Sequence, residues 1–120
     1  MSAQWWERAR AAETAQAQEM LRGFVAELLR RGREPGPLRA RAGSVRCRTD
    51  VVGWYLRANG SLGVDAAGRY YVLDVAPVLL GRFRRVHVDP AEPPLQVGRG
   101  ARDGESVELA ELLRRRLTEL

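Results

Sequence analysis

The side chains best suited to proton transfer or nucleophilic attack are His87 and Cys47, the single histidine and the single cysteine. His87 lies in the stretch VHV, and on a regular strand Asp89 shares its face, as the carboxylate that orients a general base does. No GxSxG-type nucleophile accompanies this pair, and nothing in the sequence brings Cys47 close to it. We therefore expect a surface or structural histidine, no catalytic residues and no enzyme.

Cys47 stands in VRCRT, two residues after Val45, so both side chains share one face of a strand. Arg46 and Arg48 could lower the pKa of the thiol, but we favour a small buried hydrophobe. One cysteine and one histidine cannot complete a four-ligand zinc site, and no internal disulfide is possible. We expect no metal and no cofactor.

A glycine-rich stretch, GRGARDG at 98–104, raises the possibility of a phosphate loop, because N–H groups at a helix start attract anions. It matches neither GxGxxG nor GxxxxGK[ST], and Asp103 and Glu105 would repel a phosphate. We interpret it as a loop in which Asp103 caps the helix that follows.

A basic ladder is the remaining chemical feature, and its five members are Arg39, Arg41, Arg46, Arg48 and Arg57. All 20 basic residues are arginine, and lysine and isoleucine are absent, which is typical of a high-GC bacterium. The net charge of +5 is therefore weak evidence for a nucleic-acid partner. Its distribution says more, because residues 35–60 hold five arginines and one acid, a net charge of +4.

Arginine suits phosphate because its planar guanidinium donates two parallel hydrogen bonds. If neighbouring strands bring the ladder together, Trp54 or Tyr55 could add a stacking ring. Binding of single-stranded RNA or DNA through this arginine-rich sheet face is our alternative functional hypothesis. The simpler interpretation is the solvated side of a sheet.

Three kinds of element must position these residues. Helical spacing of apolar residues over 1–34, ended by Gly32, predicts a long amphipathic helix, and 35–37 is a linker. Residues 38–89 alternate with period two and predict an antiparallel sheet, with strands near 51–58, 61–64, 69–75 and 82–89. The parity of the alternation changes at Gly43-Ser44, so a β-bulge or a tight turn is expected there.

The turns Asn59-Gly60 and DAAG at 65–68 predict a meander. Residues 90–104 are predicted to form a loop. A second amphipathic helix over 105–120 is predicted by the apolar pattern Val107, Ala110, Leu113, Leu117 and Leu120. We therefore expect a single α+β domain over 1–120, with a four- to five-stranded antiparallel meander and both helices packed on one sheet face.

The 120-residue chain contains no apolar run near the 18 or so residues of a membrane span, and its amino terminus lacks a signal pattern. We expect a cytoplasmic protein without a membrane partner.

The leading functional hypothesis is a non-catalytic protein-interaction or adaptor module. Adjacent tryptophans at 5 and 6 lie about 100° apart on a helix, so one must sit near the rim of any packing face. The helix also carries two apolar columns, 20-24-28 and 17-21-25-29, which a second copy of the chain could bury. We therefore expect self-association through this helix, as a homodimer, or binding to another protein. The candidate partner-binding residues are Trp5, Trp6, Met20, Leu21, Phe24, Val25 and Leu28. In the simpler alternative, the second column meets the carboxy-terminal helix.

Overall fold

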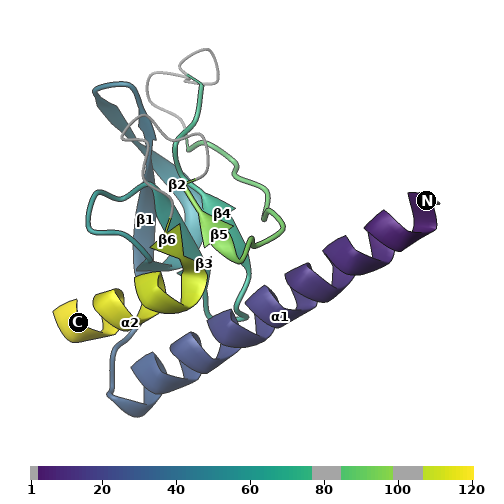
Figure 1. Ribbon diagram of the computed structural model, residues 1–120. Coiled ribbons are helices and arrows are strands. Elements are labelled where there is room, and N and C mark those ends of the chain that lie inside the picture. Colours follow the sequence, from purple (N-terminus) through teal and green to yellow (C-terminus); the bar gives the residue numbers. More distant parts are fainter. Residues whose placement is uncertain (1–2, 77–84, 99–106) are drawn as a thin grey trace.

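The computed structural model describes residues 3–76, 85–98 and 107–120, and Figure 1 shows two helices running along one side of a twisted sheet. The main sheet is antiparallel with strand order β1-β2-β3-β4, and β5 and β6 pair in a small second sheet. In chain order the elements are α1 Ala3–Arg30, β1 Gly36–Ala42, β2 Val45–Tyr55, β3 Leu62–Asp65, β4 Tyr70–Val72, β5 Gln96–Val97, β6 Val107–Glu108 and α2 Leu109–Glu119. The α+β fold with a meander and terminal helices is confirmed.

The main core lies between the two helices and the sheet. α1 buries one face of its carboxyl-terminal half there, and α2 buries Leu109, Leu112 and Leu113. From the sheet, Trp54, Leu56, Leu62, Val64 and Tyr70 complete the cluster. A second cluster, built around Leu38, Val51 and Tyr71, lies elsewhere in the sheet. Tyr70 belongs to the main core and its neighbour Tyr71 to the second cluster, so the two clusters lie on opposite faces of the sheet.

The β1–β2 hairpin turns at Gly43-Ser44, where Ala42 pairs with Val45. The turn is two residues long and Gly43 has a φ of 62°, a left-handed conformation that glycine adopts without steric cost. Of the two expectations for this position, the tight turn is confirmed. Because the turn sets the register, it decides which side chains face each other across the hairpin.

Both edges of this hairpin are covered for part of their length. Arg41 pairs in parallel with Asp74, and Thr49 pairs in parallel with Val86. At the far end of β2, Gly53 crosses β3 so closely that a Cβ would lie 1.9 Å from the Val64 carbonyl oxygen. The β3–β4 turn is held by Asp65, a buried carboxylate that accepts hydrogen bonds from two backbone N–H groups and from the Tyr71 hydroxyl.

Several predicted boundaries differ from the structure. The strand predicted at 51–58 is the second half of β2, and residues 85–89 of the strand predicted at 82–89 carry only the isolated bridge at Val86. The loop predicted at 90–104 contains β5, because Gln96 and Val97 pair with β6. That pairing also shortens the second helix, which begins at Leu109 with Glu108 as its N-cap. The predicted cap, Asp103, lies outside the described residues.

Candidate functional site

The β1–β2 hairpin brings four arginines of the sequence ladder onto one outward face. Arg39 lies directly opposite Arg48, and Arg41 lies directly opposite Arg46. The alternate residues Leu38, Ala40 and Ala42 are buried. We call Arg39, Arg41, Arg46 and Arg48 the arginine face.

These like-charged pairs occupy the closest positions that an antiparallel ladder offers. The backbone N–H of Arg41 donates to Leu73 O at 2.6 Å, and its carbonyl accepts from Val75 N at 2.7 Å. The backbone N–H and C=O of Arg41 therefore point away from Arg46, so Arg41 and Arg46 form a non-hydrogen-bonded pair. Arg39 and Arg48, two residues along the strands, form a pair of the same type. In such non-hydrogen-bonded pairs the Cα atoms lie about 4.5 Å apart, and like charges directly opposite each other are destabilising.

The arginine face lacks the acidic partners that most other arginines have. Among the described residues, eight arginines form ion pairs with Asp or Glu, such as Arg30 with Glu27 at 2.6 Å. None of the four arginines of the face forms one within the described part of the chain, although Asp74 pairs with the backbone of Arg41. Among the described residues, the one hydrogen bond donated by a side chain of the face runs from Arg41 to the carbonyl of Asn59, at 3.2 Å. Within residues 3–76, 85–98 and 107–120, no carboxylate therefore forms a direct ion pair with the charges of the face.

The other residues proposed for nucleic-acid binding do not join this face. Arg57 is half-buried and lines a different hollow with Arg115 and Arg116, and its Nε is buried with no hydrogen-bond partner among the described residues. Trp54 is in the main core, and Tyr55 is half-buried with its hydroxyl accepting a hydrogen bond from the Arg39 N–H at 2.8 Å. The arginine face therefore has no stacking ring from these two residues.

His87 is 70% exposed and is held between two carboxylates. Its Nδ1 contacts Asp50, and its Nε2 lies 2.7 Å from an Asp89 oxygen. Hydrogen bonds to Asp50 and then to Asp89 raise the pKa of His87 above its ordinary value. Burial alone would raise the pKa of Asp50, but hydrogen bonds from His87 and the Val88 N–H lower it.

With both ring nitrogens engaged, His87 leaves neither one open to accept a proton from a substrate. The sequence pattern indicated Asp89 as its neighbour but missed Asp50, because only the pairing of β2 with residue 86 brings that carboxylate close.

Cys47 is half-buried on the inward side of the hairpin, with its Sγ 3.7 Å from the Ala40 carbonyl oxygen. No group of three or more His, Cys, Asp or Glu suited to holding a metal ion occurs among the described residues.

The predicted partner-binding residues fall into two groups. Leu21, Phe24, Val25 and Leu28 are buried in the chain's own core, and Met20 packs against it. Both apolar columns contribute to that core because α1 contacts α2 as well as the sheet, and only Leu29, at the end of the second column, is exposed. These four side chains are therefore not available to a partner in this conformation.

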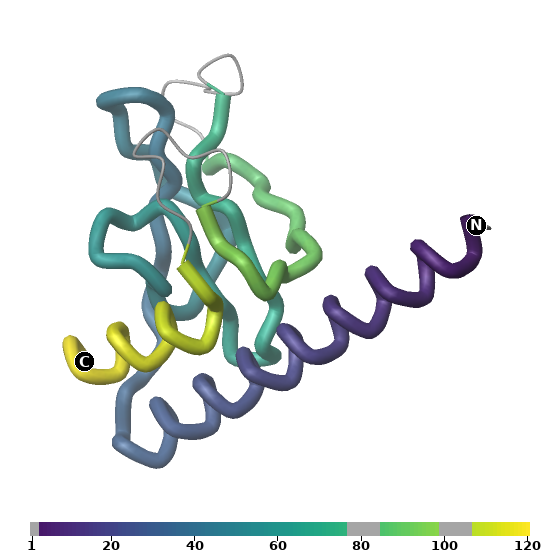
Figure 2. The backbone as a smooth tube through the Cα atoms, viewed as in Figure 1, coloured from purple at the N-terminus to yellow at the C-terminus, as the bar shows by residue number. Residues whose placement is uncertain are grey.

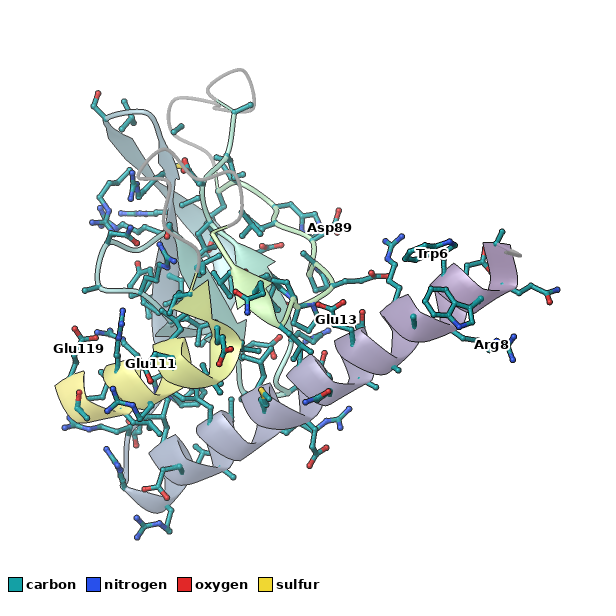
Figure 3. All side chains as sticks on the ribbon, in the orientation of Figure 1. Trp6, Arg8, Glu13, Asp89, Glu111 and Glu119 are labelled. Carbon is teal, nitrogen blue, oxygen red and sulfur yellow. The ribbon has the colours of Figure 1, made fainter. Side chains whose placement is uncertain are left out.

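Trp5 and Trp6 belong to the part of α1 that extends past the sheet (Figures 1 and 2). They are 48% and 60% exposed, and their rings meet edge to face with centroids 4.7 Å apart. We call residues 3–16 of α1 the tryptophan segment. Its described contacts with the body are few: Arg10 forms an ion pair with Glu92 at 3.2 Å, and Glu13 accepts a long hydrogen bond from the Leu95 N–H. Figure 3 shows Trp6 well away from the sheet.

Comparison with protein-family models, curated proteins and solved structures finds no match to this chain. Among the described residues, neither helix has the length and apolar character that crossing a membrane requires.

The register of the arginine face predicts an unusual effect of charge reversal. Arg46→Glu converts the Arg41 pair from like to opposite charge, so we expect the free energy of unfolding to rise by up to about 1 kcal/mol in urea titrations at low salt. The gain should shrink as salt screens the pair. Arg114→Glu makes the same change in net charge but breaks an ion pair with Glu111, so it should lower stability. A loss of stability in Arg46→Glu would contradict the observed register.

The carboxylates around His87 predict a raised pKa in a proton NMR titration of the imidazole. The midpoint should exceed 6.5, and Asp50→Asn should lower it more than Asp89→Asn does. Because the folded-state pKa is raised, the stabilisation from the imidazolium is fully present below about pH 6.5 and is lost as pH rises through the folded-state pKa. A wild-type midpoint at or below 6.5 would show that the two carboxylates do not hold the ring in solution.

Proposed function

We propose that this chain is a non-catalytic interaction module that self-associates through the tryptophan segment. The observation that carries the proposal is the exposure of Trp5 and Trp6, 48% and 60%, on a helix segment that lies beyond the body. Tryptophan is enriched at the centres of protein interfaces, where a fully covered aromatic side chain buries about 150–250 Å².

The face that carries the tryptophans suits a second copy of the same helix. Ala9 lies four residues after Trp5 and three after Trp6, so it sits beside both rings on the helix surface. Ala12 continues this face, and its small side chain allows a second helix to approach closely. Two antiparallel copies that cross between Ala9 and Ala12 bring Arg8 of one copy level with Glu13 of the other, which makes the contact self-complementary in charge.

The helical conformation of the tryptophan segment also supports the proposal that a partner covers it. An isolated helix of about 12–15 residues is marginal in water, and most helical stability in proteins comes from packing of an apolar face. Residues 3–13 are all exposed, so the body supplies little of that packing. A second copy would supply it and would cover both indoles at the same time.

Solution mass as a function of concentration tests this proposal. Light scattering or sedimentation of the full chain should show a dimer forming in the micromolar range, and Trp5→Ala/Trp6→Ala should weaken association at least tenfold. A matched control is Leu29→Ala, which removes a 51% exposed apolar side chain from the other end of α1 and should leave the mass unchanged.

A wild-type chain that remains monomeric at several hundred micromolar would contradict the proposal. So would a dimer that Trp5→Ala/Trp6→Ala leaves intact, because the association would then use another surface.

A further inference from the structure

The like-charged pairs of the arginine face destabilise the folded chain, and they contribute to neither of its core clusters. Two like-charged pairs stand in direct register at the closest type of ladder position, and Arg41 and Arg46 are not needed by either core cluster. The same chain places acids beside eight of its other described arginines. Surfaces that reduce stability in this way are typical of binding sites, where the missing countercharge comes from the ligand.

We propose that the arginine face binds the phosphate groups of single-stranded nucleic acid. Each pair presents two guanidinium groups side by side, and guanidinium matches phosphate oxygens through paired N–H donors. Successive pairs lie two residues apart along the strands, about 7 Å. This footprint covers neighbouring phosphates of one strand, whereas the major groove of a duplex is about 12 Å wide.

The surroundings of the face extend its positive charge. A hollow of about 320 Å³ lies beside the pair Arg39–Arg48. The residues that line this hollow include both arginines of the pair, Arg85 and Asp50. Asp50 is the acidic member, and its carboxylate is engaged by His87 and by the Val88 N–H. Arg85 thus adds a third guanidinium to those of Arg39 and Arg48.

The character of the face favours nucleic acid over a protein partner. Protein interfaces have an apolar centre enriched in aromatic residues, whereas nucleic-acid interfaces are polar, wet and strongly positive. Between positions 39 and 48 the four arginines alternate with residues of the other face, and the exposed apolar residue there, Val45 beside the turn, pairs with Ala42 on that other face, so no apolar residue separates the arginines. Because Trp54 is buried, binding rests on the phosphates and does not depend on base identity.

Fluorescence anisotropy with a labelled 20-nucleotide oligo(dT) tests the assignment. The affinity of the full chain should fall linearly with salt on a logarithmic scale between 50 and 200 mM. Arg39→Gln/Arg48→Gln and Arg41→Gln/Arg46→Gln should each weaken binding at least tenfold at 50 mM salt. Each should also flatten the salt slope by up to about 1.4, the contribution of two single-strand phosphates.

The matched control is Arg114→Gln/Arg115→Gln, which removes the same charge from α2, where both arginines are paired with Glu111. Its affinity should stay within twofold of wild type. Unfolding midpoints of the two face variants should not fall, because each loses a like-charged pair, and this separates lost binding from lost folding. Trp5→Ala/Trp6→Ala leaves the arginine face intact, so its residual binding tests this inference separately from self-association.

Three results would overturn the proposal. The first is the absence of oligo(dT) binding at 50 mM salt, and the second is an equal loss of affinity in the Arg114→Gln/Arg115→Gln control. The third is competition in which polyglutamate, phosphatidylserine vesicles or a 20-base-pair duplex displaces the labelled oligo(dT) as well as unlabelled oligo(dT) does at equal charge. That result would assign the face to acidic proteins, membranes or double-stranded DNA.

Discussion

The burial of the carboxyl-terminal half of α1 is the packing constraint on which the rest of the molecule depends. Ala17, Leu21, Phe24, Val25 and Leu28 join α2 to the sheet in one cluster. No proline or kink interrupts the helix before this face begins, so the tryptophan segment must continue along the same axis for about 21 Å. The buried half and the exposed half are therefore consequences of one uninterrupted helix, and the exposure of the two tryptophans follows from the packing of the remainder.

The second constraint is the register of the β1–β2 hairpin. A two-residue turn at Gly43-Ser44 leaves one arrangement in which Leu38 and Ala40 face inward, and that arrangement sets arginine against arginine on the outside. Residues 73–75 pair with the edge of β1, and Val86 pairs with the edge of β2, which holds the hairpin in place. The two candidate surfaces thus have different origins. The tryptophan segment is exposed because the first half of α1 packs against little of the body, and the arginine face forms because of the register of the β1–β2 hairpin.

The sequence alone predicted the elements well, because apolar periodicity and turn residues are local signals: the helix spacing, the Gly32 cap and the meander turns all stand in the structure. It could not predict contacts that depend on long-range pairing. The Asp50–His87 contact and the β5–β6 pair join residues that have no local pattern linking them. The two apolar columns of α1 showed that the helix was widely covered, but periodicity does not distinguish a partner chain from the chain's own α2. Likewise, the sequence shows the arginine ladder, but the direct pairing of arginine with arginine could be predicted only once the geometry of the turn was known.

The claim that the tryptophan segment is an association surface can be tested residue by residue with amide hydrogen exchange at several protein concentrations. If a second copy covers this segment, protection of amides 5–16 will rise as the concentration increases, while protection of amides 17–28 stays constant because the chain's own core supplies it. Amides 5–16 that exchange at the rate of an unfolded peptide at every concentration would show that the segment has no partner of its own kind.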